Sequence, residues 1–480
     1  PTWPHRDNPG MNTSTSAASA ATSFSRLPLS PAVLANLAQL GFDAMTPIQA
    51  AALPLALAGH DLIAQARTGS GKTAAFALAL LAKIDTKNNA VQAMVLCPTR
   101  ELAEQVTQEI RRLARAEENV KVLPLCGGAP IKPQTESLAH GAHVVIGTPG
   151  RLMDHLERGT LNLDAMQTLV LDEADRMLDM GFIDDIRTVL RQCPKNRQTL
   201  LFSATYPEGI AQLSKQFLRD PKEVRLAERH APNQIRQRFY EVTDEQRLHT
   251  VSLLLAHYRP VSTLAFCNTR QQCRDLVDVL TGLGYSALAL HGDLEQRDRD
   301  QVLIQFANRS VSVLVATDVA ARGLDIAQLE AVINVDVSDD IQQHVHRVGR
   351  TGRAGEEGWA FSLASLDDMG RVGQVEAAMG FVSEWHPLSE LTPAAGGPLQ
   401  APMVTLQILG GRKDKVRPGD VLGALTGEAK LTADQVGKIN VTEVFTYVAV
   451  ARDVAAAALQ RLQNGNIKGR KMKLRFLHDA

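Results

Sequence analysis

The sequence has few cysteines, and their arrangement argues against two common kinds of stabilised domain. Five cysteines are scattered over 480 residues, and none belongs to a Cys-x-x-Cys pair. This pattern disfavours a disulfide framework and a structural zinc site, so we expect no disulfide partner and a reducing, cytoplasmic environment. Long apolar runs are also missing. No uninterrupted stretch reaches the roughly 18 apolar residues of a membrane-spanning helix, so we expect no membrane association.

Hydrophobic residues are scarce at the N-terminus. Residues 1–23 are rich in Ser, Thr and Ala and lack the charged-then-apolar order of a signal peptide, so we expect a disordered tail. Met11 resembles an initiator residue. Residues 1–10 are therefore either native sequence or a start-site artefact.

The net charge of −1 conceals an uneven distribution. Residues 401–480 carry 13 Lys and Arg against 7 Asp and Glu, a net charge of +6, which leaves −7 for the residues before them. A solvated tail is one explanation of such a segment. Its apolar residues recur periodically, however, which favours a separately folded basic module.

A glycine-rich segment predicts a phosphate-binding loop. It lies between a strand-like run at residues 61–65 and a helix-forming run at residues 74–84, which is the order such a loop requires. Backbone N–H groups can cradle the phosphates, Lys72 can neutralise their charge, and the Thr73 hydroxyl can join a magnesium shell. Alanine stands where the pattern has its first glycine, but the later glycines are intact. The residues expected to contact ATP here are Ala66, Thr68, Gly69, Ser70, Gly71, Lys72 and Thr73.

The segment Asp172-Glu-Ala-Asp175 supplies carboxylates for the same site. It ends the apolar run at residues 169–171, so the first carboxylate can face a magnesium ion and the second an attacking water. Alone, these four residues are more typical of a solvated acidic helix start. The upstream loop favours catalysis instead. We therefore expect ATP and Mg²⁺ as cofactors, with Lys72, Asp172 and Glu173 catalytic and with Thr73 and Asp172 facing the metal.

Strand-like and helix-like runs alternate in two successive regions, which predicts two parallel α/β sheets. Segments at residues 229–234 and 392–402 have linker-like positions and composition. The strand-like runs are residues 61–65, 93–97, 143–146, 168–171 and 199–202 in the first region, and residues 263–266, 287–290, 311–315 and 331–335 in the second.

From Phe24 to Arg353 the chain resembles the DEAD-box family of ATP-dependent RNA helicases. The resemblance implies an RNA-dependent ATPase with two tandem RecA-like parallel-sheet domains, residues 24–228 and 235–391. Besides the two nucleotide motifs, the matching segments are Gly41-Phe42, Thr46-Pro-Ile-Gln49, Pro98-Thr-Arg-Glu-Leu102, Gly127-Gly128, Thr148-Pro-Gly-Arg151, Ser203-Ala-Thr205, Asn268-Thr-Arg270, Ala316-Thr-Asp318, Ala321-Arg-Gly-Leu-Asp325 and His346-Arg-Val-Gly-Arg-Thr-Gly-Arg353.

The same resemblance assigns residue roles. Phe24 and Gln49 would contact the adenine, and Gly323 and Asp325 the ribose side of ATP. Hydrolysis would be coupled to strand separation through Asp175, Ser203 and Thr205. The implied RNA contacts are Pro98, Thr99, Arg100, Gly128, Thr148, Pro149, Gly150, Arg151, Arg270, Gln271, Arg274 and Thr317. Hydroxyls, backbone amides and arginines read phosphate and 2′-OH groups, so we expect this core to be indifferent to base sequence.

The last motif adds His346, Arg350 and Arg353 to the catalytic residues. Arg350 and Arg353 are three residues apart and can present two fixed guanidinium groups to phosphate oxygens, as arginine fingers do. A surface salt bridge is the ordinary alternative. Because these arginines belong to the second domain and Lys72 to the first, hydrolysis would require the two domains to close around ATP.

The C-terminal module, residues 403–477, has the β-α-β-β-α-β order of an RRM-like α+β domain. Its strand-like runs are residues 403–409, 438–440, 444–450 and 473–476, with helices near 420–425 and 455–462. Phe445 and Tyr447 alternate on one strand, so both rings share a face. They either stack on RNA bases or fill the core, and the sequence leaves both readings open.

Residues 410–420 resemble the signature of the bacterial DbpA group within this family. That resemblance implies binding to a hairpin of large-subunit ribosomal RNA near the peptidyl-transferase centre, in ribosome assembly. We name the expected contact region the basic surface, with a plain solvated face as its alternative. The basic surface comprises Arg412, Lys413, Lys415, Arg417, Lys468, Arg470, Lys471 and Lys473.

Two classes of function remain open from the sequence. One is an RNA-dependent ATPase that separates short duplexes, which the intact Ser203-Ala-Thr205 favours. The other is an ATP-gated RNA clamp or scaffold without productive unwinding. DNA unwinding is a third and weaker reading, because the core motifs are of the RNA type.

Overall fold

The computed structural model describes residues 22–66, 69–225, 235–321, 329–352, 357–427 and 430–477. The expected N-terminal tail therefore lies almost entirely outside the described residues, and the expected linker at 229–234 lies wholly outside them. The chain divides into two compact units near residue 229. Within the described residues, no helix is long and apolar enough to cross a membrane.

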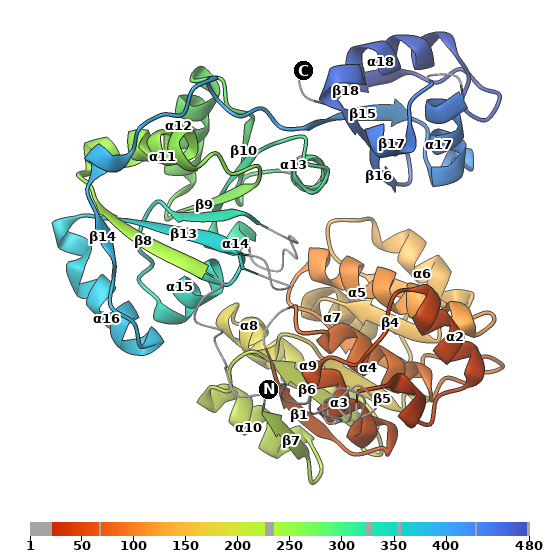
Figure 1. The fold of residues 1–480 in the computed structure, drawn as a ribbon. Coiled ribbons are helices and arrows are strands. Elements are labelled where there is room, and N and C mark those ends of the chain that lie inside the picture. Colours follow the sequence, from red (N-terminus) through yellow and green to blue (C-terminus); the bar gives the residue numbers. More distant parts are fainter. Residues whose placement is uncertain are drawn as a thin grey trace, which may run out of the picture. The chain divides into compact units, whose positions relative to one another are not determined.

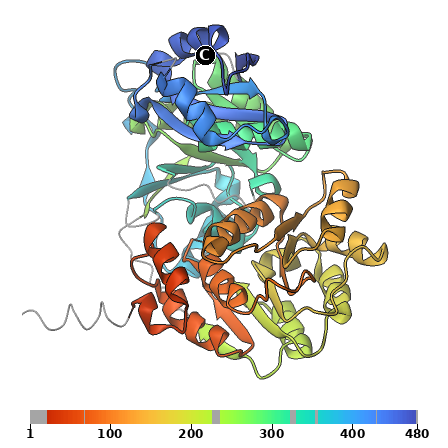
Figure 2. The same ribbon diagram turned by 90° about the vertical axis from the view of Figure 1, so that its right-hand side faces the viewer.

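The first unit contains a parallel sheet with helices on both faces (Figures 1 and 2). Its described strands follow the order β3-β4-β2-β5-β6-β1-β7. They are β1 (Leu62–Gln65), β2 (Ala93–Leu96), β3 (Val122–Leu125), β4 (Val144–Gly147), β5 (Thr168–Leu171), β6 (Gln198–Ser203) and β7 (Lys222–Arg225). This order places β6 between β5 and β1, so the segments that follow these three strands emerge side by side.

Alternating side chains of the strands supply two cores. Val95, Val170 and Phe202 pack toward the helices α2 to α5, whereas Met94, Leu169 and Leu201 pack toward the helices α7 to α10. The helices are α2 (Pro31–Gln39), α3 (Pro47–Leu57), α4 (Lys72–Leu81), α5 (Arg100–Leu113), α6 (Ile131–Ala139), α7 (Pro149–Glu157), α8 (Ala174–Asp179), α9 (Ile183–Gln192) and α10 (Glu208–Phe217), with the short η1 (Phe24–Arg26) and η2 (Ala114–Ala116).

The second unit begins with a similar parallel sheet, whose described strands follow the order β10-β11-β9-β12-β13-β8-β14. Its strands are β8 (Ile235–Glu241), β9 (Thr263–Cys267), β10 (Ala287–Leu290), β11 (Val313–Thr317), β12 (Ala331–Asn334), β13 (Gly358–Ala364) and β14 (Trp385–His386). Its helices are α11 (Asp244–Tyr258), α12 (Arg270–Gly282), α13 (Gln296–Ala307), α14 (Asp318–Ala321), α15 (Ile341–Val348) and α16 (Met369–Met379), with η3 (Leu366–Asp368) and η4 (Leu388–Glu390).

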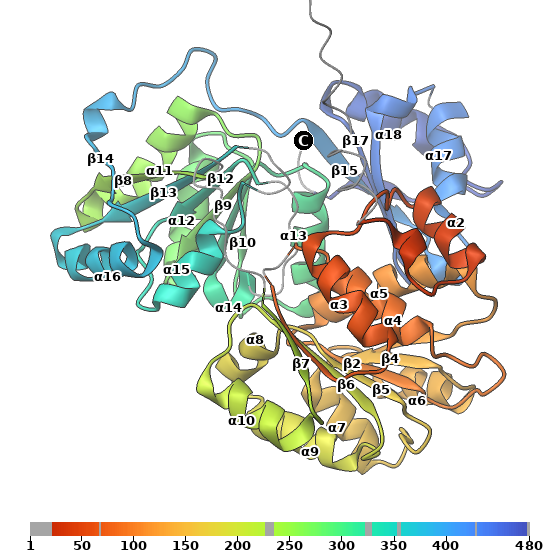
Figure 3. The same ribbon diagram turned by 60° about the horizontal axis from the view of Figure 1, so that its bottom comes forward.

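The C-terminal domain has a four-stranded antiparallel sheet in the order β16-β17-β15-β18, the arrangement of an RRM-like fold. Its helices α17 and α18 pack on one face of this sheet (Figure 3). The elements are β15 (Met403–Leu409), η5 (Arg412–Asp414), α17 (Pro418–Gly427), η6 (Ala433–Gln435), β16 (Val436–Val441), β17 (Phe445–Ala451), η7 (Arg452–Val454), α18 (Ala455–Asn464) and β18 (Leu474–Phe476). Two RecA-like parallel sheets with an RRM-like α+β domain confirm the expected fold class.

Candidate active site and RNA-binding surfaces

The ends of three adjacent strands assemble the expected nucleotide site in the first domain. Asp172 follows β5, Ser203 ends β6, and Ala66 follows β1. The Ala66 amide donates to the Ser203 carbonyl at 3.0 Å, and the Asp172 amide donates to the Leu96 carbonyl at 3.0 Å. The phosphate-loop and carboxylate motifs, far apart in the sequence, therefore meet at one edge of the sheet.

The phosphate loop depends on a glycine at its last turn. Gly71 has φ of 93° and precedes α4. A Cβ atom at this position would lie 2.6 Å from Nε2 of Gln49 and 2.9 Å from Oγ1 of Thr46. Any larger residue would therefore push these two side chains away and would also strain the backbone.

Gln49 joins the loop to the adenine motif. Its Nε2 donates to the Gly71 carbonyl at 3.1 Å, and its Oε1 accepts from the Thr46 amide at 2.9 Å. The side chain is 1% exposed. Gln49 thus braces the phosphate loop in this structure, and adenine contact by this residue stays a prediction. Phe24, the other expected adenine residue, is buried and packs edge-on against Phe42 at 6.2 Å between ring centroids.

A cavity of about 500 Å³ lies over these elements and is lined by Gln49, Gly69, Gly71, Lys72, Thr73, Asp172 and Glu173 among others. Three buried groups of its lining residues have no hydrogen-bond partner among the described residues: the Lys72 ammonium, Oδ1 of Asp172 and Oε1 of Gln105. Burial raises the pKa of Asp172 to about 7, with Glu173 adding to the rise and Lys72 opposing it. An unpaired cation and an unpaired carboxylate in one cavity fit a polyphosphate and its counter-cation.

Glu173 lies beside this pair in an unusual backbone conformation. Its φ of 52° places a non-glycine residue in the left-handed region, just before α8. Backbone strain of this kind clusters at functional sites. The Glu173 carboxylate pairs with the Arg176 guanidinium, and both side chains are largely buried. This ion pair fixes the carboxylate at the edge of the cavity.

The expected coupling residues form one hydrogen-bonded group. Oδ2 of Asp175 accepts from the Thr205 amide at 2.7 Å and from the Thr205 hydroxyl at 2.8 Å. The Asp175 amide donates to Oγ of Ser203 at 3.2 Å. Because the Ser203 carbonyl also binds the Ala66 amide, this group joins the start of the phosphate loop to the carboxylate motif.

Three expected RNA segments of the first domain are also assembled. The Arg100 guanidinium lies against Gly127 and Gly128, and a Cβ at Gly128 would approach its Nη1 to 1.9 Å. Arg151 donates to the Ala129 carbonyl at 2.9 Å and to Gln134 at 3.0 Å. The Arg151 side chain is 12% exposed, so in this structure it binds the neighbouring loop more than it faces solvent.

The other residues of these segments lie at the starts of two helices. The Thr99 hydroxyl caps α5 by accepting from the Leu102 amide at 3.2 Å, and Pro98 precedes it. Thr148 precedes α7, and Pro149 and Gly150 are its first residues. All of these positions follow the β2 and β4 strands, which are neighbours in the sheet.

In the second domain Arg347 connects the ends of three neighbouring strands. This residue is 1% exposed and lies inside the His346–Arg353 motif. Its guanidinium donates to the Asp318 carboxylate at 2.5 and 2.7 Å, to the Asp336 carbonyl at 2.7 Å and to the Asn268 side chain at 3.2 Å. We did not assign Arg347 from the sequence, although its place within the motif could have indicated it.

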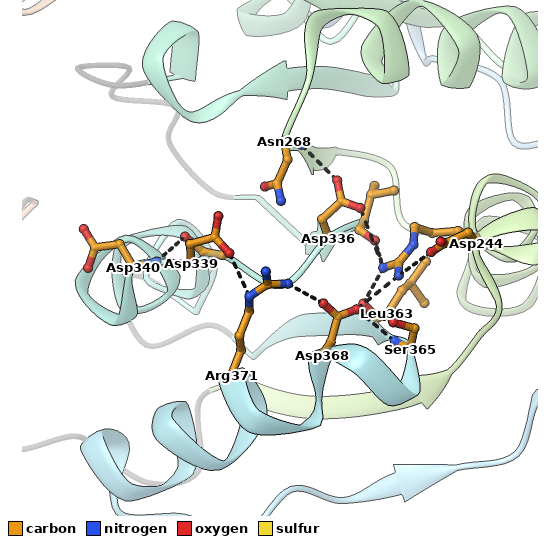
Figure 4. A network of polar contacts seen from close by, with 12 residues as sticks. Asp244, Asn268, Asp336, Asp339, Asp340, Leu363, Ser365, Asp368 and Arg371 are labelled. Carbon is orange, nitrogen blue, oxygen red and sulfur yellow. Dashed lines mark hydrogen bonds and ion pairs between the residues drawn. The ribbon is translucent and has the colours of Figure 1, made fainter.

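A second buried arginine, Arg247, extends this network, and Figure 4 labels Asn268, Asp336, Leu363 and Asp368 among the residues of the network. Arg247 donates to the carbonyls of Val335 and Leu363 at 2.8 and 3.0 Å and to the Asp368 carboxylate at 3.1 Å. Asp336 in turn accepts from the Asn268 amide at 2.9 Å. Arg247 also lies 3.7 Å from the Asp336 carboxylate, so the network connects α11 and η3 to the turn that carries the expected RNA motif of this domain.

The expected RNA-binding residues at this turn contact other side chains. Asp293 accepts from both Arg270 and Arg274, the latter at 2.5 Å. Gln271 donates to Asp275 at 2.8 Å, and Thr317 ends β11. Both arginines remain substantially exposed, at 61% and 46%.

The expected arginine fingers are only partly described. Arg350 is 6% exposed and follows α15, which contains His346. Arg353, Thr68, Gly323 and Asp325 lie outside the described residues.

The C-terminal domain brings the two halves of the basic surface together. The Lys468 ammonium donates to the Lys415 carbonyl and lies 3.6 Å from the Asp420 carboxylate. The loop after β15 and the loop before β18 are therefore adjacent. All eight expected basic residues are exposed: Arg412, Lys413, Lys415, Arg417, Lys468, Arg470, Lys471 and Lys473.

The two aromatic residues of β17 have a different environment. Their ring centroids are 6.3 Å apart, as expected for neighbours on one face. Tyr447 is 4% exposed, and the Arg297 guanidinium lies 5.3 Å from the centroid of the Phe445 ring. Base stacking by these rings stays a prediction.

Comparison with known families divides the chain in the same way. The DEAD/DEAH box helicase model matches residues 46–213, the helicase conserved C-terminal domain model matches residues 245–355, and the DbpA RNA binding domain model matches residues 405–476.

Known proteins match over most of the chain. The ATP-dependent RNA helicase DbpA of Escherichia coli K12 is 52% identical over 460 residues, which cover 95% of this chain and 100% of that protein. The DEAD-box ATP-dependent RNA helicase CshA of Geobacillus kaustophilus is 44% identical over 357 residues, which cover 74% of this chain and 76% of that protein. The solved structure of S. cerevisiae Dbp5 bound to RNA and ADP BeF3 aligns with a TM-score of 0.71 and 30% identity, covering 77% of this chain and 96% of that one. The chain therefore belongs to the DEAD-box family of ATP-dependent RNA helicases, in the group of the bacterial DbpA proteins, and is an RNA-dependent ATPase and helicase.

Proposed function

We propose that this helicase separates short RNA duplexes during assembly of the large ribosomal subunit, and that its C-terminal domain directs it there by binding a hairpin of ribosomal RNA. The observation that carries the proposal is the adjacency of the two basic loops, which form one exposed surface in a domain of the DbpA RNA-binding type. Because all five cysteines are free, we place the protein in a reducing cytoplasm.

In the first domain the proposed chemistry starts from the Lys72 ammonium and Oδ1 of Asp172, which are buried and have no partner among the described residues. Lys72 neutralises phosphate charge. Asp172 and Thr73 would hold Mg²⁺, which would supply Lewis-acid polarisation of the terminal phosphate. The donor set fits that ion because Oδ1 of Asp172 is buried and has no partner in the part of the chain that the structure describes. Glu173 orients the attacking water and accepts its proton. Arg350 and Arg353, from the second domain, stabilise the charge that develops on the phosphate when the domains close.

Coupling to RNA follows from the contacts of Asp175. Its hydrogen bonds to Ser203 and Thr205 join the carboxylate motif to the end of β6, next to the phosphate loop. A displacement of the carboxylate motif on ATP hydrolysis would therefore move the segment after β6 directly. This short connection favours an unwinding ATPase over an ATP-gated clamp.

The ATPase rate on a panel of RNAs tests the proposal. Fragments of large-subunit ribosomal RNA that contain the target hairpin should stimulate the full chain more than length-matched scrambled RNAs do. A chain that ends at residue 391 should lose this preference and keep the stimulation by generic RNA. Equal stimulation of the full chain by all RNAs would contradict the ribosomal target.

A further inference from the structure

The nucleotide cavity contains a polar atom that none of the expected contacts uses. Oε1 of Gln105 is buried and has no hydrogen-bond partner in the part of the chain that the structure describes. Gln105 lines the same cavity as Lys72 and Asp172, the two other lining residues with such an atom. The proposed chemistry uses the Lys72 ammonium and the Asp172 carboxylate, and it leaves the Gln105 amide without a role.

The helix that carries Gln105 fixes its place in the cavity. The apolar side of α5, which includes Leu102 and Val106, packs into the first core of the domain, and Gln105 is partly buried beside it. α5 follows β2, the strand that pairs with β5. The Asp172 amide, just after β5, donates to the carbonyl of Leu96 at the end of β2. Gln105 therefore comes from the strand next to the one that presents Asp172.

A buried amide oxygen without a partner is unfavourable. In water this oxygen would accept hydrogen bonds, and burial without a partner forfeits them. An apolar side chain would fill the same position on the helix without that loss. Unsatisfied polar groups are rare in protein interiors, so each one calls for a physical explanation. A ligand that brings the missing donor supplies one for Gln105.

The chemistry of a magnesium nucleotide limits which of its groups can satisfy Oε1 of Gln105. Ionised phosphate oxygens are acceptors, as Oε1 is, so the phosphates cannot supply the donor. The nucleoside carries hydroxyl and amino groups. Magnesium usually keeps several water molecules when one or two carboxylates and the phosphates bind it, and these waters are donors too. The missing donor therefore has two possible sources, the nucleoside and the hydrated ion.

We propose that Gln105 is a further nucleotide-binding residue of this cavity, and that its amide oxygen accepts a hydrogen bond from a donor that arrives with the magnesium nucleotide. This inference rests on the nucleotide part of the proposed function. The same helix begins with Arg100 and is capped by Thr99, which belong to an expected RNA segment. α5 thus carries a nucleotide contact in its second turn and RNA contacts at its start.

The Gln105→Met variant of the full chain tests the proposal, because methionine keeps the length of the side chain and removes the amide. Without nucleotide it should melt at the wild-type temperature or above, since a buried oxygen without a partner has been removed. It should bind a fluorescent ADP, in the presence of magnesium, about fivefold more weakly, because one hydrogen bond is lost. Unchanged ADP affinity would overturn the proposal, and a lower melting temperature would overturn its premise.

Two further variants make the result specific. Thr107→Val removes a buried hydroxyl of the same helix that already donates to the Ala103 carbonyl at 2.7 Å, so ADP affinity should stay unchanged. An equal loss of affinity in Thr107→Val and Gln105→Met would overturn the proposal. Lys72→Ala should weaken ADP binding. Weaker binding by Lys72→Ala but not by Gln105→Met would refute this inference alone, whereas an ineffective Lys72→Ala would refute the proposed nucleotide site and this inference with it.

Displacement of the fluorescent ADP identifies the source of the donor. Magnesium tripolyphosphate brings the hydrated ion without a nucleoside. If Gln105→Met binds both tripolyphosphate and ATP about fivefold more weakly than the wild type does, the donor is water at the ion. A deficit with ATP alone assigns the donor to the nucleoside. Equal affinities of the two proteins for both ligands would overturn the proposal.

RNA affinity in the absence of nucleotide separates the amide from the helix. Because Thr99 and Arg100 lie at the start of α5, a displaced helix would also weaken RNA binding. Gln105→Met should therefore change RNA affinity by less than about twofold when no nucleotide is present. A tenfold loss of RNA affinity would show that the variant acts through the helix, and it would overturn the assignment of the amide.

Discussion

Replacing Arg247 by methionine should destabilise the second RecA-like domain far more than replacing Arg371, although both arginines bind the same carboxylate. Arg247 is 6% exposed and Asp368 is 9% exposed. The variant removes the buried partner of Asp368 and two hydrogen bonds to the carbonyls of Val335 and Leu363. Breaking a buried ion pair from one side costs about 3–5 kcal/mol. Because Ser365 and Arg371 still bind Asp368, we expect a loss near 3 kcal/mol.

The matched control is Arg371→Met. Arg371 is 45% exposed, and exposed pairs contribute about 0–1 kcal/mol. The assay is denaturant unfolding of the full chain, followed by tryptophan fluorescence. Trp359 and Trp385 both lie in the second domain, so the signal reports mainly on that domain. Equal losses for the two variants, or a loss below about 1 kcal/mol for Arg247→Met, would refute the reasoning.

The same network predicts how the stability of the second domain changes as the pH falls. Burial alone would raise the pKa of Asp368, but hydrogen bonds from Ser365 and Arg247 outweigh it and lower the pKa. A lowered folded-state pKa contributes stability that is present above the unfolded value and is lost as the pH falls through the folded one. The second domain should therefore lose stability on acidification, and Arg247→Met should show a smaller loss over the same range.

Four further predictions address the nucleotide and RNA sites. Glu173→Gln should bind ATP and RNA normally but hydrolyse ATP at least about 100-fold more slowly in a steady-state assay, because the water loses its base; near-normal turnover would contradict the assignment. Gln49→Ala should weaken ATP binding measured by calorimetry and reduce the preference for ATP over GTP, and an unchanged preference would leave Gln49 only its bracing role. Gly128→Ala should displace Arg100 and weaken RNA binding in a fluorescence titration without changing ATP binding, whereas Gly373→Ala, whose added methyl group meets nothing within 4 Å, should change neither. Neutralising three cations of the basic surface should reduce the slope of log RNA affinity against log salt concentration by up to about three, because fewer counterions are released on binding. An unchanged slope would mean that this surface does not contact phosphate.

The sequence predicted those parts of the fold in which local pattern and burial agree. The runs at residues 168–171, 287–290 and 403–409 are strands with the expected bounds. Each is short and apolar and is bounded by polar residues, which is the pattern of a buried strand. The phosphate loop and the carboxylate motif could be placed together because each directly follows a strand-like run, and the carboxyl ends of parallel strands lie at the same side of a sheet.

Several strands were not predicted, because they contain charged side chains. Contacts with residues distant in the sequence, or exposure at the sheet edge, make these side chains compatible with a strand. β7 contains Lys222 and Arg225 and has a mostly exposed pattern, as an edge strand does. β8 carries two arginines whose guanidinium groups lie 5.3 Å from the Trp359 ring, so packing on that ring replaces apolar contacts. A single sequence gives no sign of a partner more than 100 residues away.

The supporting network of the second domain was missed for the same reason. Arg247 and Asp368 are 121 residues apart and belong to no motif. Asp336 follows the strand run at residues 331–334, and a carboxylate in that place is a signal that sequence reasoning could have used. The contact between Ser310 and Thr405 was equally hidden, because both buried residues look like ordinary surface residues in the sequence.

Release of a short RNA duplex attached to a hairpin of large-subunit ribosomal RNA tests the account most directly. The full chain should release the strand with ATP and fail to release it with a non-hydrolysable analogue. Glu173→Gln should bind the substrate and fail to release the strand with ATP. Release should fall strongly when the hairpin is scrambled or when the chain ends at residue 391. Strand release that needs neither hydrolysis nor the hairpin would contradict the central claim that the RNA-anchored core couples ATP hydrolysis to strand separation.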